Sequence, residues 1–491
     1  MLCWQIETIC TGLRPSTMVY IILLSVLGVV LLMLIIMTHY FHALAKPKKQ
    51  DSDITIYESG EENKKEKLEF SKGSVYAAMI GVIIAMLVCA YLIIKGTPWE
   101  GHMMEWLNLL IRLMHITFGI AWIGASFYFV FLENALNRTE NVRNELAGNL
   151  WAIHGGGFYY LEKYKIAPKQ IPRHLHWFKY EAYFTWLSGF CLLFVVYYFN
   201  ARAFLIDTNV LNISPLAAVG IGIGSFIVGW IIYDLLCKTP LVKKGYWFTI
   251  IGSIILVGFA YFYTHVFNSR AAYIHFGAML GTLMAGNVFF IIIPSQKAMV
   301  KAAKEGKAPD PGLGKHAGLR SMHNNYFTLP VLFVMVSNHF PTTFGNEYPW
   351  LILAVISLGT AGVKHWLNLK EKGQYSIWIL PGSAIVLLAA VFMTAPAKPG
   401  ECKKEISFAQ VNAIINTRCI SCHSGKPTDN IYTTPPNGVA YDTPQDIIKM
   451  KEKIMLRVVI TKTMPQNNKT GITPEEREII RCWIDQGASL K

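Results

Sequence analysis

Long apolar segments constrain the fold of this chain more than any other feature. A helix that crosses the hydrocarbon of a bilayer, about 30 Å thick, needs about 20 mainly apolar residues because it rises about 1.5 Å per residue. Ten stretches of the 491-residue sequence meet this requirement, and they predict an all-α, polytopic helical bundle of about ten spans in a lipid bilayer. They cover residues 17–38, 74–94, 106–132, 182–199, 215–236, 247–265, 271–293, 326–340, 350–366 and 377–394.

The low charge content supports a membrane protein. Only 15% of the residues are charged and 53% are hydrophobic, whereas soluble proteins carry about 25% charged residues. The net charge of +14 does not indicate a nucleic-acid partner, because the basic residues of membrane proteins gather in cytoplasmic loops. These values exclude a water-soluble globule and a disordered scaffold, and we expect no nucleic acid among the partners.

The Lys and Arg residues predict the side on which each loop lies. The segment after the first apolar stretch is rich in lysine, and every second loop from there on is also basic. This pattern places five basic loops in the cytoplasm, and it places the N-terminus and the C-terminal tail outside. Residues 1–17 lack the basic region of a cleaved signal peptide, so we interpret the first apolar stretch as a retained anchor.

A polar tail of about 90 residues follows the last apolar stretch, after a short linker at residues 396–403. In the tail, Cys419, Cys422 and His423 form a CxxCH motif. The two thiolates of such a motif attach haem covalently, and the histidine supplies an iron ligand. A partial zinc site is the alternative, but no second CxxC pair is present to complete it. We therefore expect one covalent haem c.

A methionine downstream of the motif is expected to be the second iron ligand. Met464 is our choice because it precedes a proline in a loop, whereas Met450 and Met455 fall in a Lys-rich helical pattern. The loop precedes a helix that Thr473, Pro474 and Glu476 should open as a capping box. With a helix before CxxCH and another at the end, residues from about 404 to 490 resemble class I cytochromes c.

Histidines in apolar segments are costly and often functional. His115, His275 and His339 lie within or at the ends of predicted spans, and the topology places them in the outer half, with His265 nearby. Each single histidine has an ordinary alternative, namely burial against a carbonyl or a serine. Together they predict a redox or substrate site, in which imidazole binds a second haem or a metal, or acts as a base. Asn287 and Asn338 could complete the pocket.

The cytoplasmic side carries its own aromatic and polar residues. Residues 151–164 combine His154, three glycines and several aromatics, and residues 174–186 are also rich in aromatics. Consecutive glycines allow close approach of backbone to a ligand, but an aromatic belt at the membrane interface explains the aromatics without any function. Residues 323–326, HNNY, are equally explained by the end of a helix.

Several long motifs resemble one family. Residues 105–136 (EWLNLLIRLMHITFGIAWIGASFYFVFLENAL), 151–164 (WAIHGGGFYYLEKY), 176–190 (HWFKYEAYFTWLSGF), 323–339 (HNNYFTLPVLFVMVSNH) and 464–473 (MPQNNKTGIT) are similar to the bacterial membrane-bound urate oxidase, or urate hydroxylase, with a C-terminal cytochrome c. That family has eight membrane helices, which the third to tenth stretches would supply. The resemblance implies a urate oxidase-like membrane domain at 103–395, the linker, and a cytochrome c domain at 404–491. Residues 1–102, with two helices and a charged cytoplasmic stretch, form an N-terminal extension that departs from the family.

The resemblance also implies an activity. The family oxidises urate to 5-hydroxyisourate in purine degradation and passes the electrons to its haem and on to the respiratory chain, without forming peroxide. The expected partners are therefore urate and an electron acceptor, either a soluble cytochrome c or a terminal oxidase. The expected location is the bacterial inner membrane, with the cytochrome c domain on the periplasmic side. A non-catalytic electron-transfer subunit of a respiratory complex is the alternative function, and a transporter fused to a redox sensor is a third.

Overall fold

The computed structural model describes Gly81, Ile94, Thr97 and residues 99–490, except 169, 173, 174, 397–399, 403 and 433. The chain divides into two compact units, Met1–Met103 and Met104–Lys491, and nearly all described residues belong to the second. The predicted spans at 17–38 and 74–94, and the charged stretch between them, lie outside the described residues. The same is true of part of the predicted linker.

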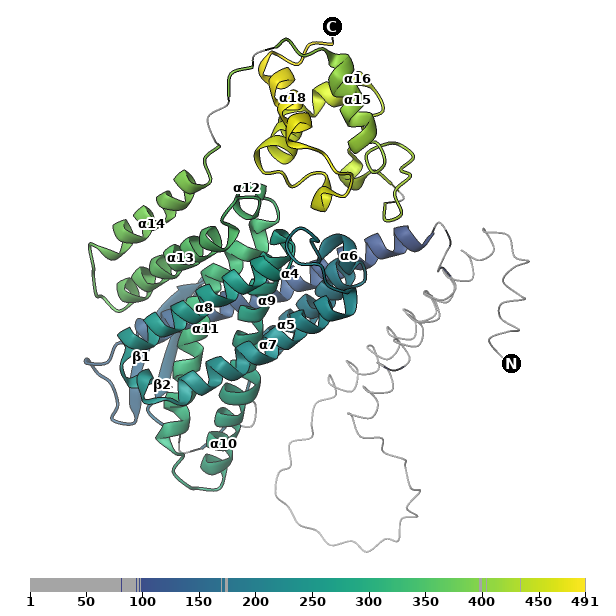
Figure 1. The fold of residues 1–491 in the computed structure, drawn as a ribbon. Helices are drawn as coiled ribbons and strands as arrows, with labels where there is room; N and C mark the ends of the chain where they lie inside the picture. The colour runs from purple at the N-terminus through teal and green to yellow at the C-terminus, as the bar shows by residue number, and fades with distance from the viewer. Residues whose placement is uncertain are drawn as a thin grey trace, which may run out of the picture. The chain divides into compact units, whose positions relative to one another are not determined.

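The described part of the chain is mostly helical (Figure 1). The described residues up to 395, which we call the membrane domain, contain α4 (Trp99–Asn134), β1 (Leu146–His154), β2 (Gly157–Tyr164), α5 (Tyr180–Leu193), η1 (Phe194–Tyr198), α6 (Ala201–Phe204), α7 (Pro215–Lys238), η2 (Pro240–Lys243), α8 (Gly245–Val266), α9 (Ser269–Gly286), η3 (Asn287–Ile292), α10 (Ile293–Lys304), α11 (Pro311–Ser337), α12 (Pro341–Phe344), α13 (Pro349–Glu371) and α14 (Ile379–Met393). The tail (residues 404–491) contains α15 (Phe408–Arg418), η4 (Pro436–Gly438), α16 (Pro444–Lys449), α17 (Lys451–Ile454), η5 (Met455–Ile460), η6 (Gln466–Asn468) and α18 (Pro474–Asp485).

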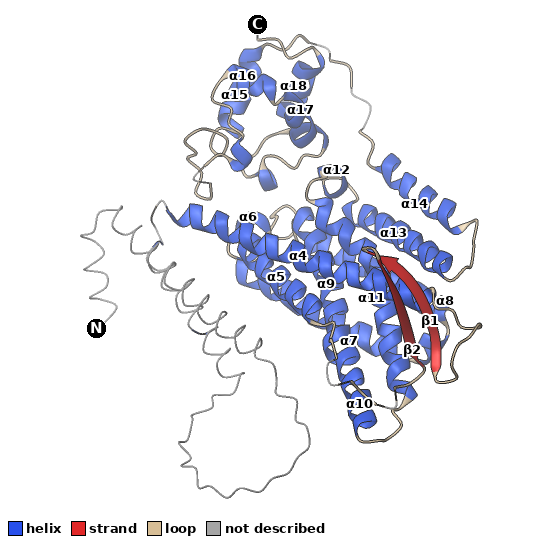
Figure 2. Cartoon of the chain, turned by 180° about the vertical axis from the view of Figure 1, so that it is seen from behind, coloured by secondary structure: helices blue, strands red, loops and turns tan. Residues whose placement is uncertain are grey.

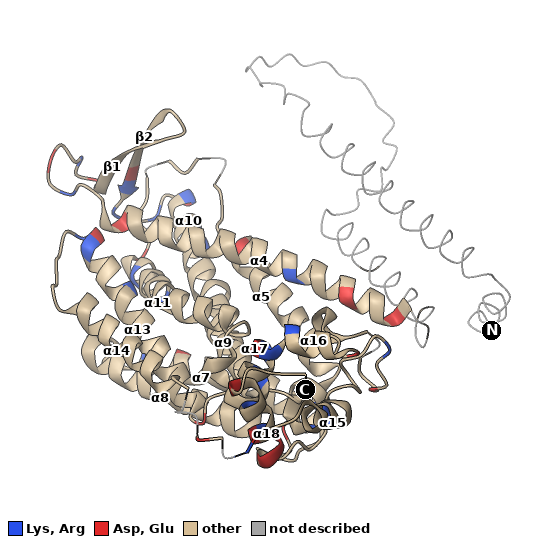
Figure 3. Ribbon diagram, turned by 90° about the horizontal axis from the view of Figure 1, so that it is seen from above, with Lys and Arg blue, Asp and Glu red and all other residues tan. Residues whose placement is uncertain are grey.

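Six of the described helical segments are long and apolar enough to cross a membrane, which is consistent with membrane association. They coincide with six of the ten predicted stretches, and they are Trp99–Asn134, Tyr180–Tyr198, Pro215–Lys238, Gly245–Val266, Ser269–Lys304 and Pro349–Glu371. The stretch at 377–394 contains the shorter apolar helix α14, and the stretch at 326–340 lies mostly in the second half of α11. Residues 323–326 therefore lie in the middle of a helix, and their interpretation as a helix end is wrong. In Figure 3, residues coloured as charged are found along α4, in the hairpin, in the tail and at several helix ends, and most of the bundle is tan.

Helix α9 forms the centre of the membrane domain. It contacts α5, α7, α8 and α11, and most of its side chains are buried. Small residues allow this close packing, as is common between membrane helices. A Cβ on Gly286 would lie 2.5 Å from the Trp230 ring, and one on Gly277 would lie 2.5 Å from Val334. Substitution at either glycine would therefore push α9 away from its neighbours.

The prediction of a purely helical fold is wrong in one place. Strands β1 and β2 form an antiparallel hairpin in which His154 pairs with Gly157 (Figure 2). Gly155 and Gly156 make the two-residue turn, and both have the positive φ that such a turn requires. Two of the three glycines in residues 151–164 therefore form a turn, and the turn explains them without a ligand. Trp151 and Phe158 of the hairpin are exposed.

The tail has its own hydrophobic core. Phe408 of α15 packs against Trp483 of α18, with ring centres 5.8 Å apart, and Trp483 is almost fully buried. A disulfide between Cys402 and Cys482 joins the linker region to α18. The scattered cysteines of the sequence gave no prediction of this bond, because its partners are 80 residues apart.

Candidate functional site

The CxxCH motif begins where α15 ends. A capping box formed by Ser407 and Gln410 starts this helix. After the helix, the amide of Cys419 donates to the carbonyl of Ile415, and the amide of His423 donates to the carbonyl of Cys419 at 2.9 Å. The motif is thus held in a compact turn. Cys419 is buried in the core of the tail, and burial raises the pKa of its thiol to about 12.

His423 is oriented by a backbone carbonyl. Its Nδ1 lies 2.8 Å from the carbonyl oxygen of Val439, which can only accept a hydrogen bond. This contact requires the proton on Nδ1 and leaves the lone pair on Nε2 available for a metal. An imidazole that ligates a metal is commonly held by such a contact.

Met464 lies in a loop that is fastened at its backbone. Its amide donates to the carbonyl of Arg457 at 3.0 Å, and its carbonyl accepts from Arg477 at 2.8 Å. Its side chain packs against the same core as Cys419. Helix α18 follows, and the predicted capping box of Thr473 and Glu476 is confirmed, with Pro474 at the first helical position.

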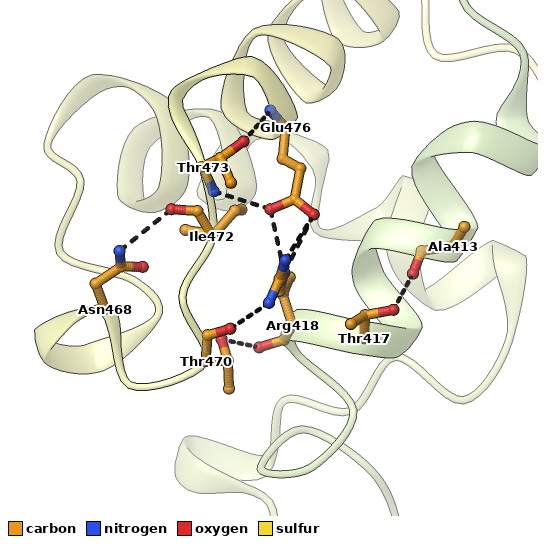
Figure 4. A network of polar contacts seen from close by, with 8 residues as sticks. All are labelled: Ala413, Thr417, Arg418, Asn468, Thr470, Ile472, Thr473 and Glu476. Carbon is orange, nitrogen blue, oxygen red and sulfur yellow. Dashed lines mark hydrogen bonds and ion pairs between the residues drawn. The ribbon is translucent and has the colours of Figure 1, made fainter.

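One ion pair connects the end of α15, next to the CxxCH motif, to the start of α18. Arg418, next to Cys419, donates to both carboxylate oxygens of Glu476, with distances of 3.0 to 3.2 Å (Figure 4). The hydroxyl of Thr470 also donates to the carbonyl of Arg418 at 2.8 Å. The end of α15 and the start of α18 are therefore held together around the motif.

The Met464 loop also contacts the membrane domain. The side-chain amide of Asn467 donates to the carbonyls of Ala203 at 3.0 Å and Ile206 at 2.7 Å. The Gln466 amide donates to the carbonyl of Ala203 at 2.6 Å, and Asn268 donates to Asn467. The loop that carries the predicted iron ligand thus forms one of the contacts between the tail and the membrane domain.

A cavity of about 670 Å³ lies beside this contact. Met464 and Tyr432 line it from the tail, and Arg270 lines it from the membrane domain together with Arg457 of the tail. Burial lowers the pKa of Arg457, and the charge of Arg270 lowers it further. The cavity is therefore suited to a group with negative charge.

The structure does not bring the three predicted catalytic histidines together. His115 Nδ1 lies 3.0 Å from the carbonyl oxygen of Thr185 and 3.3 Å from Ser188 Oγ. His275 is fully buried, with Nδ1 2.8 Å from the carbonyl of Ala271. His339 follows α11 and is exposed. In the described residues no contact joins these histidines, and their catalytic role stays a prediction.

His275 has a second partner, and a glycine makes room for it. The hydroxyl of Tyr198 lies 3.0 Å from His275 Nε2. A Cβ on Gly222 would lie 2.8 Å from this hydroxyl and 3.1 Å from Nε2. The absence of a side chain at residue 222 therefore permits the pair.

Sequence reasoning assigned Asn287 to the pocket of the histidines, but the structure places it in a buried polar cluster between α7, η3 and α11. Arg320 donates to Asp234 at 2.6 Å and to Asn287 at 3.2 Å. Asn287 donates to the hydroxyl of Tyr233 at 2.9 Å. The same hydroxyl lies 2.9 Å from His323 Nδ1. The spacing of 320 and 323 on one helical face was the available signal. Within the described residues, no group of three or more His, Cys, Asp or Glu is placed to hold a metal ion.

A second missed group contains Asn325, Lys364 and Asn368, all buried between α11 and α13. The signal in the sequence was a lysine inside an apolar stretch, which membrane helices rarely carry without a function.

A comparison with protein families identifies the membrane domain. The family model described as urate oxidase N-terminal matches residues 101–395, more than half of the chain. No curated protein and no solved structure matches the chain. The match begins within the first turn of α4, includes α14 and ends before the tail begins. The chain therefore belongs to the urate oxidase N-terminal family.

Proposed function

We propose that this protein is a membrane-bound, cytochrome c-linked urate oxidase that passes electrons to a covalent haem and on to the respiratory chain. The reaction converts urate and water to 5-hydroxyisourate and releases two protons and two electrons. Electrons that leave in this way do not reduce oxygen, so no peroxide is expected. The family match supports urate as the substrate.

The donor set of the tail fits haem c. Cys419 and Cys422 would form the thioethers, His423 would bind iron through Nε2, and Met464 would be the second iron ligand. The contact of His423 with Val439 supports this assignment because it leaves Nε2 unprotonated. When bound, the haem would accept one electron at a time. Because urate releases two, a further haem b or metal in the membrane domain belongs to the proposal.

The single observation that carries the electron route is the docking of the Met464 loop. Asn467 and Gln466 hold this loop on the carbonyls of Ala203 and Ile206. The predicted iron ligand therefore lies next to the part of the chain that matches the urate oxidase family. Arg270 and Arg457 beside it would favour the negative charge of haem propionates.

The proposed location is the bacterial inner membrane, with the tail on the periplasmic side. The disulfide between Cys402 and Cys482 supports this side, because disulfides persist in oxidising compartments. The basic loops support the same orientation. The electron acceptor would then be a periplasmic cytochrome c or a terminal oxidase.

Anaerobic addition of urate to the purified, oxidised protein tests the proposal. We expect the absorption bands of reduced c-type haem to appear. A Cys419→Ala/Cys422→Ala variant should lose the haem stain that survives denaturation on a gel, whereas Cys191→Ala, a free cysteine of the membrane domain, should keep it.

Two results would contradict the proposal. Stain retained in the double variant would exclude covalent attachment at this motif. Haem that dithionite reduces but urate does not would favour the non-catalytic electron-transfer subunit.

A further inference from the structure

The buried polar residues of the membrane domain fall into two groups that differ in their hydrogen bonds. In the cluster around Arg320, charge is balanced by Asp234, and each amide or hydroxyl named above has a partner. A satisfied network of this kind stabilises the packing of helices and needs no ligand.

The group of Asn325, Lys364 and Asn368 is different. Their exposed fractions are 0%, 0% and 6%. Asn368 Nδ2 donates to Asn325 Oδ1 at 3.0 Å, which joins α11 to α13. In the described part of the chain, Asn325 Nδ2, Asn368 Oδ1 and Lys364 Nζ have no hydrogen-bond partner. The group thus retains one amide donor, one amide acceptor and one ammonium.

Among the described residues, Lys364 has no carboxylate in direct contact, and the charge of Glu371 acts on it only from a distance. Its Nζ lies 3.6 Å from the centre of the Phe127 ring on α4, and no described carboxylate forms an ion pair with it. Glu371, two turns further along α13, accepts a hydrogen bond from Asn134 at 2.9 Å. Burial of an unpaired ammonium is costly, and such residues in membrane proteins mark binding sites or ion pathways.

The three side chains share one location. Lys364 and Asn368 are four residues apart, so they lie on the same face of α13. That face meets Asn325 on α11 and Phe127 on α4. Asn325 follows the satisfied residues His323 and Asn324 directly, so α11 presents a completed polar face to α7 and an incomplete one to α13.

We infer that Asn325, Lys364 and Asn368 bind the urate anion, an inference that rests on the proposed function. Urate is a planar monoanion near neutral pH, and each of its lactam edges carries an N–H donor beside a carbonyl acceptor. Lys364 balances the charge, Asn325 Nδ2 donates to a carbonyl, and Asn368 Oδ1 accepts from a ring N–H. If the amide O and N atoms of both asparagines were exchanged, one donor and one acceptor would still remain.

Binding of urate to the full-length protein tests this inference. The haem is first reduced anaerobically, so that bound urate is not consumed, and the dissociation constant is measured by equilibrium dialysis. We expect Lys364→Met to weaken urate binding about tenfold or more. Binding of hypoxanthine, a neutral purine lactam, should change much less, because the variant removes only the ammonium charge, which a neutral ligand does not need.

Lys370 provides the matched control. It lies on the same helix, with Nζ 5.4 Å from the Trp366 ring, but its side chain is exposed. Lys370→Met should change urate binding less than twofold. Lys364→Met should also melt at the same temperature as the wild type or higher, because it removes an unpaired buried charge. Loss of binding in a protein of undiminished stability would exclude unfolding as the cause.

The possible failures differ from one another. If the wild type binds urate and is reduced by it, but Lys364→Met binds urate equally well, the inference is wrong and the proposed function stands. If the wild type neither binds urate nor is reduced by it, both are wrong.

Discussion

In the tail, a side chain next to the CxxCH motif pairs with a residue that is far away in the sequence. Arg418 precedes the first cysteine of the CxxCH motif, and Glu476 lies 58 residues later in the capping box of α18. Their ion pair is largely shielded from solvent, with both side chains less than a quarter exposed. It holds the motif and the Met464 loop in one arrangement, so its loss should loosen both.

The charge of Glu476 should make the stability of the tail depend on pH. Burial alone would raise the pKa of Glu476, but hydrogen bonds from Arg418 and Thr473 outweigh it and hold the pKa below its usual value. A carboxylate with a lowered folded-state pKa stabilises the fold above about pH 4.5, and this stabilisation is lost as the pH falls through the lowered pKa. Acid should therefore weaken the tail.

Glu476→Gln is expected to reduce the free energy of unfolding of the tail by about 1–2 kcal/mol at pH 7. The difference from the wild type should shrink as the pH falls below about 4. Hydrogen exchange of amides in α15 and α18 measures both effects. Glu475→Gln, an exposed neighbour in the same turn, should have less effect, and equal effects of the two variants would contradict the role of the ion pair.

At the scale of secondary-structure elements, the helices of the tail are held by capping boxes and by a disulfide. Helix α15 is fixed by its own capping box, but α18 is also tied by the Cys402–Cys482 disulfide to the segment that leaves the membrane domain. A bond that closes a loop of this length restricts the unfolded chain and so stabilises the folded tail.

Cys402→Ser is expected to lower the free energy of unfolding of the tail by about 2–4 kcal/mol. Denaturant titration with hydrogen exchange of α18 measures the change. Wild-type protein treated with reductant should behave like the variant, which serves as the control. Unchanged protection in both cases would show that the disulfide does not support α18.

At the scale of the whole molecule, the proposed electron route depends on the contact between the tail and the membrane domain. Asn467→Ala removes hydrogen bonds to the carbonyls of Ala203 and Ile206, so urate-dependent reduction of the haem should slow several-fold, with the haem spectrum unchanged. Stopped-flow absorption measures this rate.

Asn468→Ala is the matched control for this contact. Asn468 has nearly the same positive φ as Asn467, but its side chain donates only to the carbonyl of Ile472 within the tail. Both variants carry the same backbone strain, so only Asn467→Ala should slow reduction. An equal slowing in the two variants would point to a distorted loop and not to lost docking.

The inferred urate site is separated along α13 from the end of the membrane domain that contacts the tail. Lys364 lies fifteen residues after Pro349, or about 22 Å along α13 from the end that follows Gly345. Gly345 packs against Thr461 of the tail. Because electron transfer slows steeply with distance, this separation is a second reason, besides the two electrons of urate, to include a further haem or metal in the proposed function.

Much of the fold could be predicted from patterns within short segments of the sequence. Apolar stretches of about 20 residues predicted six helices correctly, because a segment in lipid must satisfy its backbone groups within itself. The capping box at Thr473 could also be predicted, because its two partners are only three residues apart in the sequence. The hairpin at 151–164 was not predicted, although paired glycines between aromatic runs were a usable turn signal.

The sequence by itself therefore determined the apolar helices, the CxxCH motif and the cap of α18, all of which depend on neighbours within a few turns. Tertiary structure alone decided that His115, His275 and His339 do not meet, that Cys402 joins Cys482, and that Asn325 and Asn368 pair beside Lys364. Such contacts depend on which helix faces pack together. Periodicity indicates that a face is apolar, but the packing of the whole bundle selects the residue that each buried polar group will meet.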